Sequence, residues 1–232
     1  MADDGEIRSM ELLCDLQREL ENALNSLAGK ESDGLLDNFL VYSARYINNS
    51  ADGYIFLRKA SRIDASKLLI RPSIDAVVRS IAVQKQPDLL YRIAYTDRME
   101  HKRMARPIAV QAGVDYDTET EKGWSAFKRK YSTHFPKHKL VEKELKLSNA
   151  AEIAGIKGYY DRPYRLYCGV VHASFKAMRG DTHTDPFDNW TMASCVCGGL
   201  DLVVAAGGEA PKLVALCAQL SALDPGAAKP AN

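Results

Sequence analysis

The sequence of 232 residues predicts an all-α protein, a single bundle of about seven helices. Three observations predict this fold. Apolar residues recur at spacings of three and four along most of the chain, the alternation typical of strands is nearly absent, and glycine or proline interrupts the pattern between segments. Hydrophobic residues make up 46% and charged residues 26%, as in soluble globular proteins. We expect one domain over residues 1–226 and a disordered tail over 227–232.

The first three segments carry helical apolar rows. The first helix has a stripe of five leucines and ends at Gly29; the leucines are Leu13, Leu16, Leu20, Leu24 and Leu27. A second helix is predicted over 35–61, and Gly53 marks a candidate break in its middle. In the third segment, 63–84, Pro72 either kinks the helix or lies in the first turn of a new helix that begins after Ile70.

The middle of the chain is more polar. A helix is predicted from about residue 89 to about 111, where Pro107 bends or ends it. Between 122 and 139 basic residues occur without acidic ones, among aromatics at core spacing, namely Trp124, Phe127 and Tyr131. We interpret these aromatics as core residues. The basic rim is predicted to contact RNA phosphates, and its members are Lys128, Arg129 and Lys130. An exposed loop is expected over 136–146.

Asp161-Arg162-Pro163 is typical of a helix start, since aspartate favours the cap and proline the first turn. The helix that follows has a buried face of Tyr164, Tyr167, Cys168 and Val171, next to a polar strip of Arg165, Gly169, His172 and Lys176. Lys176 is a fourth predicted RNA contact. After a loop over 179–186, two more helices are predicted over 186–206 and 211–223.

Arg165 and His172 are the candidate catalytic residues. Seven positions on a helix are almost two turns, so both side chains project from one face, with their Cα atoms about 10 Å apart. A histidine can act as base for an RNA 2′-hydroxyl or as acid for the 5′-oxygen, and a guanidinium can offset charge on the phosphorane. The same pattern also fits a structural role, in which Arg165 pairs with a carboxylate and His172 donates to a carbonyl.

Arg71 and Asp75, four residues apart on one helical face, are expected to lie close to this pair. Asp75 would fix the tautomer of His172 or orient the Arg165 guanidinium, and a purely structural ion pair with Arg71 is the alternative. We expect Arg71, Asp75 and Tyr167 to orient the site.

Several function classes find no support. No Gly-rich phosphate loop, GxSxG elbow or HExxH motif occurs, and Cys195-Val196-Cys197 lacks the second cysteine pair of a zinc site. We therefore expect no metal and no other cofactor, although metal chemistry at His172 and His183 is a remote option. The five cysteines are interpreted as free thiols of a cytoplasmic protein. No apolar run is long enough for a membrane span, and a net charge of +1 limits RNA contact to a local patch.

Two stretches, Leu68–Ala76 and Tyr164–Ser174, resemble an uncharacterised all-helical bacterial family. In that family an Arg-x-x-x-Glu/Asp helix precedes a Tyr-Arg…His-Ala/Gly-Ser helix. The second stretch also resembles the Arg-x4–6-His signature of HEPN domains, helical bundles found in prokaryotic toxins and antiviral ribonucleases. This resemblance implies an up-and-down core with flanking helices. It also implies a homodimer in which Arg165 and His172 of two protomers form a composite RNA-cleaving site.

The leading hypothesis is therefore a metal-independent ribonuclease, a toxin or antiphage effector with RNA as substrate and an antitoxin or other partner protein. The alternative is a non-catalytic helical bundle that binds a protein or small-ligand partner.

Overall fold

The computed structural model describes residues 4–28, 34–113, 115–131, 141–171 and 185–224, and every regular element in these ranges is a helix. The all-α prediction is confirmed. The helices are α1 (Asp4–Ser26), α2 (Leu35–Lys59), α3 (Ile63–Lys67), α4 (Ile70–Lys85), α5 (Leu89–Gln111), α6 (Tyr116–Tyr131), α7 (Leu147–Ala154), α8 (Lys157–Val171), α10 (Asp185–Ala205) and α11 (Leu213–Ala222). The short helices α3 and α7 were not foreseen as separate elements.

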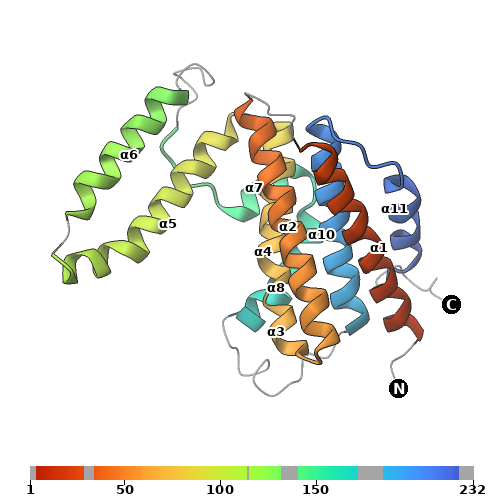
Figure 1. Ribbon diagram of the computed structural model, residues 1–232. Coiled ribbons are helices and arrows are strands. Elements are labelled where there is room, and N and C mark those ends of the chain that lie inside the picture. The colour runs from red at the N-terminus through yellow and green to blue at the C-terminus, as the bar shows by residue number, and fades with distance from the viewer. Residues whose placement is uncertain (1–3, 29–33, 114, 132–140, 172–184, 225–232) are drawn as a thin grey trace.

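The core is a bundle built around α1, α2, α4 and α10 (Figure 1). The predicted leucine stripe of α1 is buried along its whole length and faces α10 and α2. Two glycines let α10 approach its neighbours closely. A Cβ on Gly198 would lie 3.0 Å from Val77 of α4, and one on Gly199 would lie 3.0 Å from Leu20 of α1. Small residues at these crossings therefore set the spacing of the bundle.

Helices α5 and α6 form a hairpin that extends away from this bundle (Figure 1). The first turns of α5 are buried through Leu89, Leu90, Tyr91 and Ile93. Farther along, ion pairs join the two helices: Lys102 and Arg106 lie 2.9 and 3.1 Å from the carboxylate of Asp117. Trp124 is buried and stacks on Phe127, which confirms the core interpretation of these two aromatics. The Tyr131 side chain lies outside the described part of the chain.

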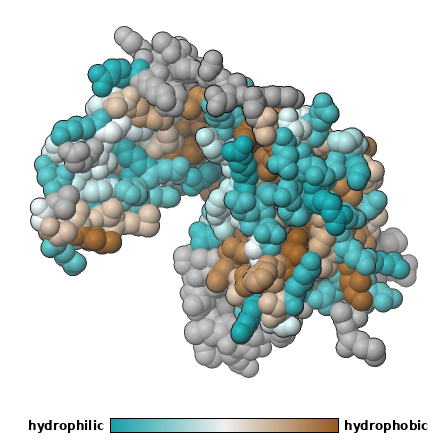
Figure 2. All heavy atoms as spheres, in the orientation of Figure 1, coloured by the Kyte–Doolittle hydropathy of each residue, from teal (hydrophilic) through white to brown (hydrophobic). Residues whose placement is uncertain are grey.

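The far half of α5 exposes the large apolar side chains Met104, Ile108 and Val110. Figure 2 shows a hydrophobic patch at this end of the hairpin, whereas most of the visible surface is hydrophilic. Among the described helices, none combines the length and the apolar character needed to cross a bilayer.

Two local predictions differ from the structure, and a third, which left two alternatives open, is decided by it. Helix α2 continues through Gly53 without a break, because that glycine packs against Leu69, to which a Cβ would come within 3.1 Å. Pro72 lies in the first turn of α4, which begins at Ile70, so the second reading of this proline is the better one. Helix α8 begins at Lys157, one turn before the predicted start, and contains Pro163. The left-handed Gly155 ends α7, and the chain returns to helix before the Asp-x-Pro signal is reached.

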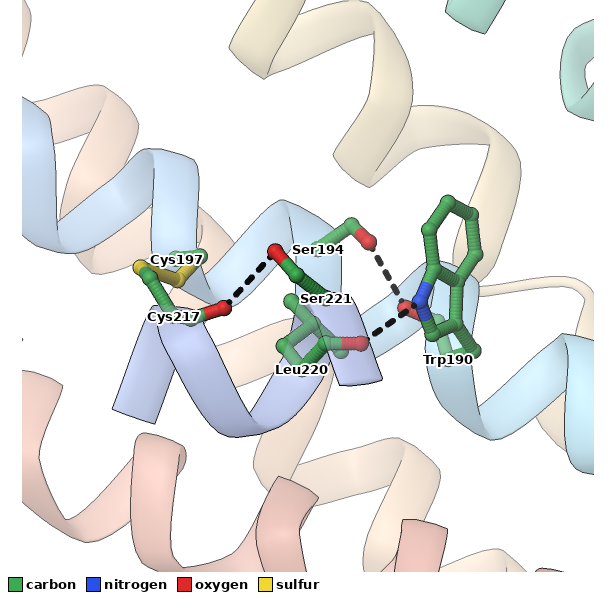
Figure 3. Close-up of a disulfide and its surroundings, with 6 residues drawn as sticks. All are labelled: Trp190, Ser194, Cys197, Cys217, Leu220 and Ser221. Atoms are coloured by element: carbon green, nitrogen blue, oxygen red, sulfur yellow. Dashed lines mark hydrogen bonds between the residues drawn. A yellow bond between two sulfur atoms is a disulfide. The ribbon is translucent and has the colours of Figure 1, made fainter. Parts of the chain in front are cut away.

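The prediction of five free thiols is wrong for two of them. Cys197 of α10 and Cys217 of α11 form a disulfide that joins the two helices, as Figure 3 shows. Cys14, Cys168 and Cys195 do not take part in a disulfide. The two bonded cysteines are 20 residues apart on separate helices, and only the packing of α11 on α10 brings their Cα atoms to 6.5 Å.

Candidate functional site

The candidate site lies where α4 packs against α8. Arg71 of α4 donates a hydrogen bond from Nη2 to the Tyr164 hydroxyl of α8 at 3.2 Å. The guanidinium carbon also lies 5.3 Å from the centre of the Tyr164 ring, within the range of a cation–π contact. Arg71 is thus held against α8 both by its charge and by a directed hydrogen bond. Arg71 is predicted to lie close to Arg165 and His172; its described contact on α8 is with Tyr164, and the convergence with the Arg165–His172 pair stays a prediction.

The face of α8 toward α4 is aromatic. Tyr160 and Tyr164 stack with ring centres 4.4 Å apart, as expected of residues four apart on a helix. Burial raises the pKa of Tyr160 to about 12, so its hydroxyl is protonated at neutral pH. Cys168 follows one turn later on the same face and is partly buried.

Asp75 is the most perturbed acid of the site. Removal from water raises its pKa to about 6, although Arg71 and Arg79 act in the opposite direction, while Glu100 adds to the rise. Its Oδ1 atom is buried without a hydrogen-bond partner among the described residues. An acid with a pKa near 6 exchanges protons readily at neutral pH, and such acids are concentrated at functional sites.

The structure describes only some of the other predicted site residues. Arg165 follows Tyr164 directly in α8, but its side chain and all of His172 lie outside the described residues. The same holds for Lys176 and for the side chain of Lys130. Lys128 and Arg129 belong to α6, on the hairpin, and Figure 1 shows α6 well separated from α8. Lys128 lies 3.2 Å from Glu142, so it is engaged within the hairpin region.

Tyr167 points to a different set of partners from those expected. It is buried, and its hydroxyl donates to Oδ1 of Asp188 at 2.5 Å. Oδ2 of the same carboxylate lies 3.7 Å from Nζ of Lys67, and both charged side chains are almost completely inaccessible. Tyr167 therefore fixes α8 to α10 and α3 and does not contact Arg71 or Asp75 through its hydroxyl.

A second set of polar contacts continues this network toward the N-terminus. Asn189, next to Asp188, accepts a hydrogen bond from the Tyr54 hydroxyl at 2.8 Å and donates to Ser9 at 3.1 Å. Arg58 pairs with Glu6 at 2.6 Å. Sequence reasoning missed this network. The available signal was Asp188-Asn189 at the start of a strongly apolar helix, where two adjacent polar residues need partners if they are buried.

The described residues contain no set of side chains that could hold a metal ion. No group of three or more histidine, cysteine or acidic side chains comes together there. His183, the remote metal candidate, lies outside these residues.

The sequence model of a family of unknown function (DUF5677) matches residues 37–189, more than half of the chain. The chain belongs to this family. The matched range runs from α2 into α10 and includes Arg71, Asp75, Tyr164 and Arg165, so the whole α4–α8 site is part of the family region. The predicted membership of an uncharacterised helical family is thereby confirmed, and the HEPN likeness stays a prediction. Comparisons with curated proteins and with solved structures gave no match.

Proposed function

We propose that the protein cleaves RNA without a metal, with Arg165 and His172 as catalytic residues. The observation that carries the proposal is the contact of Arg71 with Tyr164, the residue directly before Arg165. It brings a cation and a proton-exchanging acid, Asp75, to the helix that carries Arg165. A family of unknown function supplies no competing assignment.

In the proposed reaction His172 removes the proton of a 2′-hydroxyl, and the 2′-oxygen attacks the adjacent phosphorus. The bond to the 5′-oxygen breaks, and that oxygen takes up a proton, so the products carry a 2′,3′-cyclic phosphate and a 5′-hydroxyl. Arg165 offsets the charge that grows on the phosphorane oxygens. Arg71 and Asp75 act as positioning residues for α8. RNA phosphates would also contact Lys128, Arg129, Lys130 and Lys176.

Purified protein incubated with labelled RNA in the presence of EDTA is expected to produce 2′,3′-cyclic phosphate ends. His172→Ala and Arg165→Ala should each lower the cleavage rate by at least about 100-fold, because each removes a group that acts only in the transition state. The rate and the chemistry of the product ends are both read from one gel and one mass spectrum.

Matched controls remove the same side-chain types from exposed positions. His101→Ala in α5 and Arg45→Ala in α2 should leave the cleavage rate unchanged. Equal cleavage by wild type, His172→Ala and Arg165→Ala, or products with 5′-phosphate ends, would contradict the proposal.

The proposal includes a homodimer whose sites combine Arg165 of one protomer with His172 of its partner. A mixture of the inactive Arg165→Ala and His172→Ala proteins should then regain activity, because a mixed dimer holds one intact site. In a random equal mixture half of the dimers are mixed and each has one of two sites, so about a quarter of wild-type activity is expected. Light scattering after size-exclusion chromatography measures the dimer. Activity that does not return on mixing would place both residues in one protomer.

The exposed apolar side chains Met104, Ile108 and Val110 favour a second function, binding of a partner protein such as an antitoxin. Met104→Lys with Ile108→Lys separates the two functions. It should abolish partner capture while the cleavage rate of the free protein stays at the wild-type level.

A further inference from the structure

A cavity of about 390 Å³ lies between α4, α10 and α11, apart from the α4–α8 site. This volume is within the range of small-molecule sites. Its apolar walls come from Val77 and Ile81 of α4, Ile156, and Trp190 of α10. The indole of Trp190 is fixed, because Nε1 donates to the carbonyl of Leu220 at 3.2 Å, which Figure 3 shows beside the disulfide. The disulfide of Cys197 and Cys217 holds the two helices that form this wall.

The charges at this cavity are of one sign. Both charged residues among its described lining residues are acidic, Asp201 and Asp224, and no lysine, arginine or histidine is among them. Partial removal from water raises the pKa of Asp201, and no charged neighbour contributes to this shift. The carboxylate of Asp201 is therefore an acceptor that a cationic ligand would stabilise.

The neutral polar groups of the cavity also act as acceptors. The Ser194 hydroxyl donates to the carbonyl of Trp190 at 2.9 Å, and the Ser221 hydroxyl donates to the carbonyl of Cys217 at 3.0 Å (Figure 3). The protons of both hydroxyls are used within their own helices, so their oxygens offer lone pairs to a ligand. With the Trp190 N–H also engaged, the side chains that line the described cavity match a ligand that donates hydrogen bonds.

We propose that this cavity binds a small organic amine, a ligand with an apolar body and a protonated amino group. The body lies against Trp190 and the aliphatic side chains of α4. The ammonium group donates to Asp201 and to the serine oxygens at the rim. Among the described lining residues, an anion of the same shape would meet two carboxylates and no positively charged side chain.

Titration calorimetry with 4-phenylbutylamine and 4-phenylbutyrate at pH 7.5 tests this proposal, since the two probes share the apolar body and differ in charge. The amine is expected to bind at least about ten-fold more tightly than the acid. Asp201→Asn should weaken amine binding at least about five-fold through loss of the ion pair. Ser221→Phe, at an exposed position that lines the cavity, should abolish binding by filling it.

Asp52→Asn is the control, because it removes the same charge from an exposed position of α2 and should leave amine binding unchanged. Circular dichroism verifies that each variant is folded. Equal binding of amine and acid, unchanged amine affinity in folded Asp201→Asn, or no binding of the amine would overturn the proposal.

Discussion

Replacement of Asp188 by alanine is expected to lower the free energy of unfolding by about 3–5 kcal/mol. Asp188 is completely buried, accepts the Tyr167 hydrogen bond and lies 3.7 Å from Nζ of Lys67, whose side chain is only 2% exposed. Without the carboxylate, the buried ammonium of Lys67 loses its contact with Asp188, and Tyr167 loses the acceptor of its hydrogen bond. Urea unfolding followed by circular dichroism measures the change as a lower midpoint.

Two variants serve as matched controls: one breaks an exposed ion pair, and the other replaces the buried ion pair by apolar side chains. Asp15 pairs with Arg18 at 2.9 Å, a shorter distance, but both side chains are more than half exposed. Asp15→Ala should therefore cost less than about 1 kcal/mol, because water screens this pair and solvates each partner alone. Lys67→Met combined with Asp188→Leu should recover much of the stability that Asp188→Ala loses. If Asp188→Ala costs no more than Asp15→Ala, the buried contacts of Asp188 do not hold α3 and α8 to α10.

Asp75→Asn is expected to stabilise the folded protein above pH 7 and to leave it unchanged below about pH 4. The folded pKa of Asp75 is raised from 3.8 to about 6, so the native state favours the protonated carboxyl. The stability that wild type gains from holding this proton more tightly in the folded state is complete below the unfolded pKa of 3.8. It is lost as the pH rises through about 6. A shift of about two pKa units corresponds to about 3 kcal/mol, which is the upper bound for the gain.

The measurement is the difference in unfolding free energy between wild type and Asp75→Asn at a series of pH values from 4 to 8. The groups that face Asp75 are Arg71, Arg79 and Glu100, with Tyr160 and Tyr164 of α8. Asp52→Asn, at an exposed position, should show a difference near zero throughout. A constant difference for Asp75→Asn across this pH range would show that Asp75 has an ordinary pKa.

The helices themselves were largely predictable, because one apolar face in contact with a core leaves a regular spacing in the sequence. The leucine stripe of α1 and the core aromatics of α6 are examples. The sequence signals that mark the first residue of a helix were less reliable. Asp161-Arg162-Pro163 marks a favourable cap locally, but α8 begins earlier, where Tyr160 stacks on Tyr164. Packing over a whole turn outweighs the preference of one cap.

The candidate site was partly predictable for the same reason. Arg71 and Asp75 share one face of α4, and their charges required a partner in a buried position. That the partner is Tyr164, an uncharged residue, could not be read from the spacing. Tyr167 is predicted on the buried face of α8, as a residue that orients the site. Its hydroxyl instead contacts Asp188, because Tyr167 lies three residues after Tyr164 and its side chain is rotated by about 60° around the helix axis from that of Tyr164.

The sequence by itself determined the all-α class, the buried stripe of α1 and the common helix of Arg71 and Asp75, because each depends on spacings within one helix. The Arg165–His172 site stays a prediction. Only the tertiary structure decided which helices meet. It joined Cys197 to Cys217, buried Lys67 beside Asp188, and left a cavity of about 390 Å³ between α4, α10 and α11. These contacts connect residues far apart in the chain, and they arise from the packing of all helices together, which no local pattern records.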